Sequence, residues 1–180
     1  MVRVLIFGDS LADGLQLEGM TCETVSRWGE TTYGLLNGFP NLEHSLRTAA
    51  YDLVILIGGS NDMGSDSIPM FAIDNLMRMH HVCKRMKVSV SVGVTILHDE
   101  FNRQYVNRCR PMGIPVCNFL KEDMDTRFIA DDGIHLNDEG KQYLSRELVR
   151  TIRKPYVGAL LRDIFPNDSK LSQLIVSFMD

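Results

Sequence analysis

The sequence has no excess of positive charge and no long apolar run, and these two absences argue against broad classes of function. Lysine and arginine number 19 against 23 aspartate and glutamate residues, and the net charge is −4. Because basic side chains supply most of the affinity for nucleic-acid phosphates, we expect no nucleic-acid partner. No apolar run reaches the roughly 18 residues that a transmembrane helix requires, so we expect no membrane span.

Cysteine is also scarce, and a chain of 180 residues is long enough to fold without disulfides. The four cysteines show no CxxC spacing: Cys22, Cys83, Cys109 and Cys117. No His, Cys and Asp residues cluster at ligand spacing, so we expect no metal and no other cofactor. The first apolar run begins almost at once and leaves no room for a signal peptide. We therefore expect a cytoplasmic protein, unless the sequence is that of a trimmed form.

Short apolar runs alternate with amphipathic segments along most of the chain. We expect β-strands over residues 4–7, 21–28, 53–57, 88–97 and 114–119. We expect helices over residues 41–50, 68–87, 100–110 and 138–154, with Pro155 ending the last one. This alternation predicts right-handed βαβ crossovers and an α/β fold. The expected architecture is a three-layer α/β/α sandwich around a five-stranded parallel sheet in the order 2-1-3-4-5.

The length favours one folded domain, which we place at residues 1–154. Residues 155–180 carry two short apolar helical patterns separated by Pro166. We expect this tail to pack on the same domain or on a partner subunit, which would make a homo-oligomer.

Small polar residues follow the first three predicted strands where those strands end. Ser10 comes after the first strand, Gly29 after the second and Asn61 after the third. Because the carboxyl ends of parallel strands share one edge of the sheet, these residues are expected to lie together. Ser10 is the candidate nucleophile, although a serine at this position would equally suit a helix N-cap.

The loop before the last predicted helix supplies a histidine and an acid. Acyl transfer requires a hydroxyl, a histidine to take its proton and a carboxylate to orient that histidine. His135 can take the proton of Ser10, and Asp132, three residues earlier, can accept a hydrogen bond from Nδ1–H. Asp131 is a rival acid, but the spacing favours Asp132.

Acyl transfer also needs donors aimed at the developing oxyanion. The candidates are the backbone N–H groups of Ser10 and Gly29 and the side-chain amide of Asn61. Gly34 is an alternative to Gly29, because it lies in the same short segment. Asp9 and Asp62 flank these residues, and we expect them to brace their loops by hydrogen bonds.

The chain resembles the SGNH (GDSL) hydrolase superfamily in four blocks that occur in the family's order. The blocks are Gly8-Asp9-Ser10-Leu11, the glycine of Gly29-Glu30-Thr31-Thr32, Gly59-Ser60-Asn61-Asp62, and Asp132-Gly133-Ile134-His135-Leu136-Asn137. The resemblance covers residues 2 to about 153. It implies the flavodoxin-like SGNH fold, metal-free hydrolysis of a carboxylic ester, and the roles given above to Ser10, Gly29, Asn61, Asp132 and His135.

The chain has no large inserted lid, which favours a small-molecule ester with a short acyl group. Two alternatives remain open: an acyltransferase of the same fold, and a catalytically silent, hydrolase-like binding protein. Trp28, beside Gly29, is either a wall of the acyl or leaving-group site or a core residue. His98 either lines the pocket or lies in a loop. His80 and His81 are expected to be structural residues of a surface helix.

Overall fold

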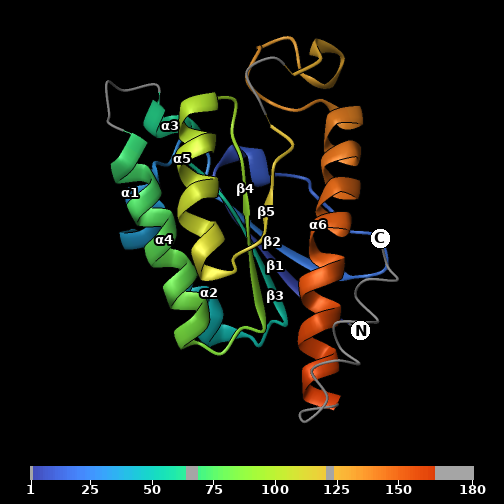
Figure 1. Cartoon of the computed structure of the whole chain (residues 1–180). Coiled ribbons are helices and arrows are strands. Elements are labelled where there is room, and N and C mark those ends of the chain that lie inside the picture. Colours follow the sequence, from blue (N-terminus) through green and yellow to red (C-terminus); the bar gives the residue numbers. More distant parts are fainter. Residues whose placement is uncertain (1, 64–68, 121–123, 165–180) are drawn as a thin grey trace.

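The computed structural model describes residues 2–63, 69–120 and 124–164. A parallel sheet lies at its centre, between one layer that contains the last helix and another that contains most of the remaining helices (Figure 1). The order of the strands is β2-β1-β3-β4-β5. The predicted three-layer α/β/α sandwich with sheet order 2-1-3-4-5 is therefore confirmed.

The strands are β1 (Arg3–Gly8), β2 (Thr21–Ser26), β3 (Leu53–Ile57), β4 (Val90–Val94) and β5 (Val116–Cys117). The strand β1 pairs in parallel with β2 on one side and with β3 on the other, so Gly8 lies opposite both Ser26 and Ile57. This register brings the carboxyl ends of the first three strands to the same edge, as the sequence predicted. The strand β5 lies at the far edge of the sheet, where Pro115 is tolerated just before it.

The helices are α1 (Thr32–Asn37), α2 (Leu42–Thr48), α3 (Ser60–Met63), α4 (Pro69–Arg85), α5 (Asp99–Cys109) and α6 (Asp138–Ile164), with short 3₁₀ helices at Ser10–Ala12, Arg110–Met112 and Thr126–Phe128. In Figure 1, α6 covers one face of the sheet, and α1, α4 and α5 lie on the opposite side. Right-handed crossovers place α1, α4 and α5 on one face, because the connections from β2 to β3, from β3 to β4 and from β4 to β5 all run in the same direction across the sheet.

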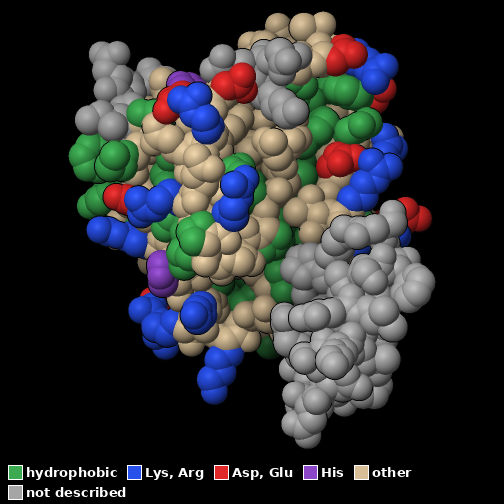
Figure 2. All heavy atoms as spheres, in the orientation of Figure 1, with side chains coloured by type: hydrophobic (Ala, Val, Ile, Leu, Met, Phe, Trp, Pro, Cys, Tyr) green, Lys and Arg blue, Asp and Glu red, His purple; other side chains and the backbone are tan. Residues whose placement is uncertain are grey.

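The central strands form the core because they are covered on both faces. Every residue of β3 is buried, as are the residues of β1 after Arg3. Continuous apolar runs are typical of such doubly covered parallel strands, so the sequence pattern identified them directly. On the surface seen in Figure 2, lysine and arginine side chains are spread over several elements, with acidic residues among them.

Two sequence predictions about helices are wrong. Helix α6 does not end at Pro155 but continues to Ile164. A proline inside a helix removes one backbone hydrogen bond, and the helix can continue past it. The predicted tail spans residues 155–180: residues 155–164 belong to α6, and residues 165–180 lie outside the described residues, so the packing of the tail stays a prediction. His80 was placed on a surface helix, whereas its side chain is buried in α4.

The burial of His80 is balanced by hydrogen bonds at both ring nitrogens. Nδ1 lies 2.8 Å from Ser91 Oγ, and Nε2 lies 2.8 Å from the Tyr105 hydroxyl. Burial lowers the pKa of His80 to about 3, so the ring is neutral at physiological pH. The expected structural role of this histidine is confirmed, although it acts within the core between α4, β4 and α5.

Candidate active site

The turn that carries Ser10 is held tightly against the neighbouring strand. The backbone N–H of Asp9 donates to the carbonyl oxygen of Ile57 at 3.1 Å. A Cβ on Gly8 would lie 2.1 Å from that same oxygen, so only glycine allows the two strand ends to approach this closely. The Asp9 carboxylate then accepts a hydrogen bond from Leu11 N–H at 3.0 Å and caps the short helix that begins at Ser10.

Ser10, His135 and Asp132 form one hydrogen-bonded chain. Ser10 Oγ lies 2.8 Å from His135 Nε2, and His135 Nδ1 lies 2.6 Å from Asp132 Oδ2. Ser10 and His135 are separated by 125 positions, and they meet because the loop before α6 returns to the edge where β1 ends. The three residues proposed from the sequence thus lie within hydrogen-bonding reach, in the geometry of a Ser-His-Asp triad.

Asp132 is oriented by its own loop. Its Oδ1 accepts hydrogen bonds from the backbone N–H groups of Ile134 and His135, both at 2.9 Å. The backbone N–H and imidazole of His135, together with the N–H of Ile134, hold the pKa of Asp132 well below its usual range. The carboxylate therefore stays ionised at any pH at which an imidazole titrates.

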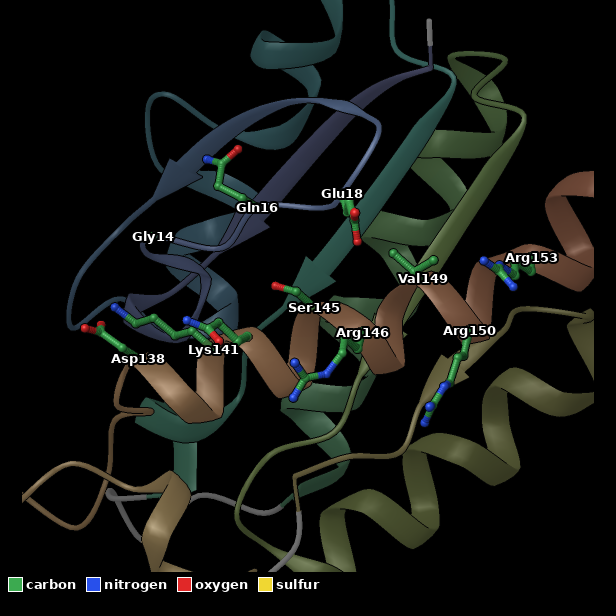
Figure 3. Close-up of a pocket in the computed structure, with 11 residues that line it drawn as sticks. Gly14, Gln16, Glu18, Asp138, Lys141, Ser145, Arg146, Val149, Arg150 and Arg153 are labelled. Carbon is green, nitrogen blue, oxygen red and sulfur yellow. The ribbon is translucent and has the colours of Figure 1, made fainter.

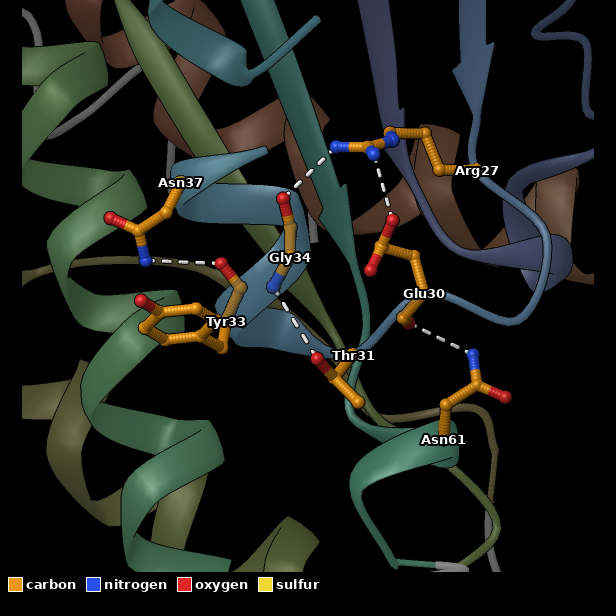
Figure 4. A network of polar contacts seen from close by, with 7 residues as sticks. All are labelled: Arg27, Glu30, Thr31, Tyr33, Gly34, Asn37 and Asn61. Carbon is orange, nitrogen blue, oxygen red and sulfur yellow. Dashed lines mark hydrogen bonds and ion pairs between the residues drawn. The ribbon is translucent and has the colours of Figure 1, made fainter. Parts of the chain in front are cut away.

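The segment after β2 forms a β-turn with Gly29 at its third position. The backbone N–H of Glu30 donates to the carbonyl of Arg27 at 3.2 Å, and the φ angle of Gly29 is +72°. A positive φ at this position of a turn favours glycine. The Arg27 guanidinium locks the turn, since it donates to Glu30 Oε2 at 2.7 Å and to the carbonyl of Gly34 at 2.9 Å (Figure 4).

The alternative oxyanion donor, Gly34, is already engaged. Its N–H donates to Thr31 Oγ1 at 3.3 Å within the N-terminal cap of α1. By contrast, within the described ranges the backbone N–H groups of Ser10 and Gly29 donate to no protein acceptor. Of the two glycines, Gly29 is the one whose N–H is available to a ligand.

Asn61, the third predicted donor, lies beside the Gly29 turn. Its Nδ2 donates to the Glu30 carbonyl at 2.9 Å, and Figure 4 shows the amide pointing toward that turn. An amide nitrogen carries two hydrogens, so this bond leaves one for another acceptor. The contact ties the loop after β3 to the loop after β2.

The two acids expected to brace these loops do so in different ways. Asp62 accepts from both the N–H and the hydroxyl of Thr32. Asp9 is fully buried and keeps one carboxylate oxygen, Oδ2, without a hydrogen-bond partner among the described residues. Burial, reinforced by the nearby charge of Asp62, raises the pKa of Asp9 to about 6.

Trp28 is not a core residue, since 66% of its surface is exposed. Its indole stacks on the His135 imidazole, with ring centroids 5.4 Å apart and planes inclined by 28°. Its position beside Gly29 was the only sequence signal for this contact. His98 caps α5 by accepting from Phe101 N–H at 3.2 Å, which accounts for the histidine structurally.

A hollow of about 910 Å³ lies beside this region, between α6 and the loop that follows Ser10. Lys141, Arg146 and Arg150 project from α6, and Gly14 and Gln16 lie on the facing loop (Figure 3). The triad residues do not line this hollow. In the part of the chain that the structure describes, no three His, Cys, Asp or Glu side chains are grouped as metal ligands, and no helix could cross a bilayer.

Comparisons by sequence and by structure give different results. Neither a protein-family model nor a curated protein matches the sequence. Solved structures match with high probability, among them a member of the lipolytic G-D-S-L family from Veillonella parvula. That structure has a TM-score of 0.65 at 16% identity, over 83% of this chain and 97% of the other.

Two esterases are similar to the same extent. The psychrotrophic esterase EstA from Pseudoalteromonas sp. has a TM-score of 0.67 at 17% identity, over 86% of this chain and 98% of EstA. An acetyl esterase has a TM-score of 0.63 at 15% identity, over 91% of this chain and all of the other. The chain therefore has the fold of the GDSL (SGNH) hydrolases, as its four sequence blocks predicted.

Proposed function

We propose that this protein is a serine hydrolase that cleaves carboxylic esters through an acyl-enzyme on Ser10. The observation that carries the proposal is the hydrogen-bonded chain from Ser10 Oγ through His135 to Asp132, at 2.8 and 2.6 Å. A serine hydroxyl is a weak nucleophile unless an adjacent base removes its proton. This geometry provides such a base, and a carboxylate that fixes its tautomer.

In the first half-reaction, Ser10 Oγ attacks the ester carbonyl carbon while its proton passes to His135 Nε2. The tetrahedral intermediate collapses when the C–O bond to the alcohol breaks and the imidazolium protonates the leaving oxygen. In the second half-reaction, a water molecule gives a proton to His135 and attacks the acyl carbon. The carboxylic acid is released, and Ser10 recovers its proton. Asp132 stays ionised throughout and stabilises the imidazolium.

The oxyanion of both intermediates would be bound by three N–H donors. The backbone N–H groups of Ser10 and Gly29 have no protein acceptor in the described residues, and Asn61 keeps one amide hydrogen free of its bond to Glu30. Donors that are fixed before the reaction stabilise the developing charge without a reorganisation cost. The locked Arg27–Glu30 turn supports this role for Gly29.

A short acyl group is the substrate class that we propose. Among the described residues, the order of strands and helices shows no large insertion that would form a lid over the site. One structural neighbour was solved as an acetyl esterase with an acetate ion, and another as an esterase inhibited by monoethylphosphonate. Both observations concern those proteins, and they make short acyl esters the first substrates to test.

The test is turnover of p-nitrophenyl acetate and butyrate by the wild-type protein and by Ser10→Ala and His135→Ala. Loss of a triad member is expected to lower kcat by up to about a million-fold. The matched control is Ser60→Ala, because Ser60 lies at the neighbouring strand end but outside the triad. Full activity in Ser10→Ala would rule out the mechanism.

Two other functions are separated by simple measurements. A silent binding protein would leave Ser10 unlabelled by a fluorophosphonate, whereas the proposed enzyme is labelled at Ser10 and not in Ser10→Ala. An acyltransferase uses the same acyl-enzyme but passes the acyl group to an alcohol. Product analysis with a competing alcohol would then show a new ester in place of the free acid.

A further inference from the structure

The two side-chain hydrogen bonds of His135 are both made by ring nitrogens, at the edge of the imidazole. Ser10 and Asp132 bind the two ring nitrogens of His135, at 2.8 and 2.6 Å. Such bonds fix the edges of a ring but resist tilting of its faces only weakly. The His135 side chain is 30% exposed and lies on a loop, and a contact on the face of its ring would restrict that tilting.

Trp28 supplies a contact on that face. The indole is stacked at 5.4 Å with an interplanar angle of 28°, which falls in the range of favourable offset aromatic pairs. An indole face is also the best aromatic partner for a cation. The imidazole becomes a cation at the moment when Ser10 loses its proton, so the stacking strengthens in the step that forms the acyl-enzyme.

The turn that presents Trp28 is anchored at both ends. The Arg27 N–H donates to the Gly8 carbonyl at 2.8 Å, and Ser26 Oγ donates to the Asp9 carbonyl at 2.9 Å. On the other side, the Arg27 guanidinium is paired with Glu30 (Figure 4). Trp28 is therefore fixed to the turn that carries Ser10, although its own side chain is mostly exposed.

We infer that Trp28 is a positioning residue for the reaction, and that its indole holds the His135 ring and stabilises the imidazolium. The inference rests on the proposed function. The exposure of the indole supports it, because a large apolar side chain gains little stability from a position that is 66% exposed.

Several charged groups share the surroundings of His135. Asp132 binds its Nδ1, Asp9 interacts with its charge from the turn after β1, and Asp138 and Glu139 begin the helix that follows. Arg27, on the Trp28 turn, is paired with Glu30. A test of the contact should therefore report whether the indole senses a proton on His135.

Trp28 is the only tryptophan of the chain, so the intrinsic indole fluorescence reports on this side chain alone. A protonated imidazole in contact with an indole quenches its emission by accepting an electron in the excited state. We expect the emission to show a pH-dependent transition, with lower intensity at acid pH, where the contacting imidazole carries the proton. The transition should be lost in His135→Gln and kept in His44→Gln, since His44 is exposed and contacts Phe39.

Emission that is independent of pH, or a transition that persists in His135→Gln, would overturn the inference. This measurement needs no substrate, so it stands apart from the ester assay. If the wild-type protein hydrolyses no ester while the transition is present, the proposed function fails and the ring contact stands.

The effect of the Trp28 indole on the reaction is tested with the variants Trp28→Leu and Trp28→Phe, assayed on p-nitrophenyl acetate. Leucine keeps apolar bulk but has no aromatic face, and we expect kcat to fall about 2- to 5-fold, as for a partly exposed cation–π pair. KM should change little, and phenylalanine should recover most of the loss. A kcat of Trp28→Leu equal to that of the wild type would show that the indole has no role in the reaction.

Discussion

Asp62 Oδ2 accepts a hydrogen bond from the backbone N–H of Thr32 at 2.8 Å, and Oδ1 accepts from the Thr32 hydroxyl at 2.7 Å. Both residues are buried. Thr32 begins α1, directly after the turn of Gly29, and Asp62 lies next to Asn61 on α3. This carboxylate thus joins the two loops that carry Gly29 and Asn61, two of the three proposed oxyanion donors.

Asp62→Ala is expected to lower the free energy of unfolding by about 2 to 4 kcal/mol, because it leaves buried donors of Thr32 unpaired. The esterase activity of the folded protein should also fall. Urea denaturation measures the first effect, and Asp62→Asn, which keeps an acceptor, should lose less. Unchanged stability in Asp62→Ala would mean that the two loops are held by other contacts.

Asn61→Ala is expected to lower kcat on p-nitrophenyl acetate by about 10²- to 10³-fold, as for the loss of one oxyanion donor. KM should change less than kcat, because the donor acts mainly on the intermediate. Asn37→Ala is the matched control, since the Asn37 amide binds the Tyr33 carbonyl on the surface of α1. A kcat within a few-fold of the wild type would remove Asn61 from the oxyanion hole.

Asp132→Asn is expected to lower kcat by about 10⁴-fold, the scale associated with a wrongly oriented histidine tautomer in a Ser-His-Asp triad. An asparagine amide facing His135 Nδ1 would donate to it, and the proton would then lie on Nε2, where Ser10 needs an acceptor. Asp131→Asn is the control and should keep near-normal activity. Equal losses in both variants would argue that the acid was wrongly assigned between the two neighbours.

Asp9 makes stability depend on pH in an unusual direction for an aspartate. Its pKa is raised to about 6 in the folded protein by burial, so between about pH 4 and pH 6 the folded state binds more protons than the unfolded state. As the pH rises through this window, ionisation of Asp9 should therefore lower the free energy of unfolding, by up to about 1.4 kcal/mol per pH unit.

Asp9→Asn cannot ionise but keeps an oxygen acceptor for the N–H of Leu11. The difference in unfolding free energy between the variant and the wild type should grow in favour of the variant from pH 4 to pH 6, and then level off. Chemical denaturation at a series of pH values measures it. A difference that is constant over this window would show that Asp9 titrates at its ordinary pH.

The sheet could be predicted because its strands are continuous apolar runs that end in small polar residues. Residues 53–57, for example, were located exactly as Leu53–Ile57. Two errors came from treating local patterns as decisive. Pro155 does not end α6, and the polar residue His80 is buried because Ser91 and Tyr105, distant in sequence, satisfy both of its nitrogens.

The sequence by itself determined where the central strands lie and the short-range geometry of the site. The spacing of Asp132 and His135 within one loop and the glycines at strand ends are local features, and local sterics and hydrogen bonding fix them. Only the tertiary structure decided that His135 meets Ser10 at 2.8 Å, that Asp62 binds Thr32, and that Trp28 stacks on the imidazole. These contacts join separate elements, so they depend on how the layers pack and leave no periodic signal in the chain.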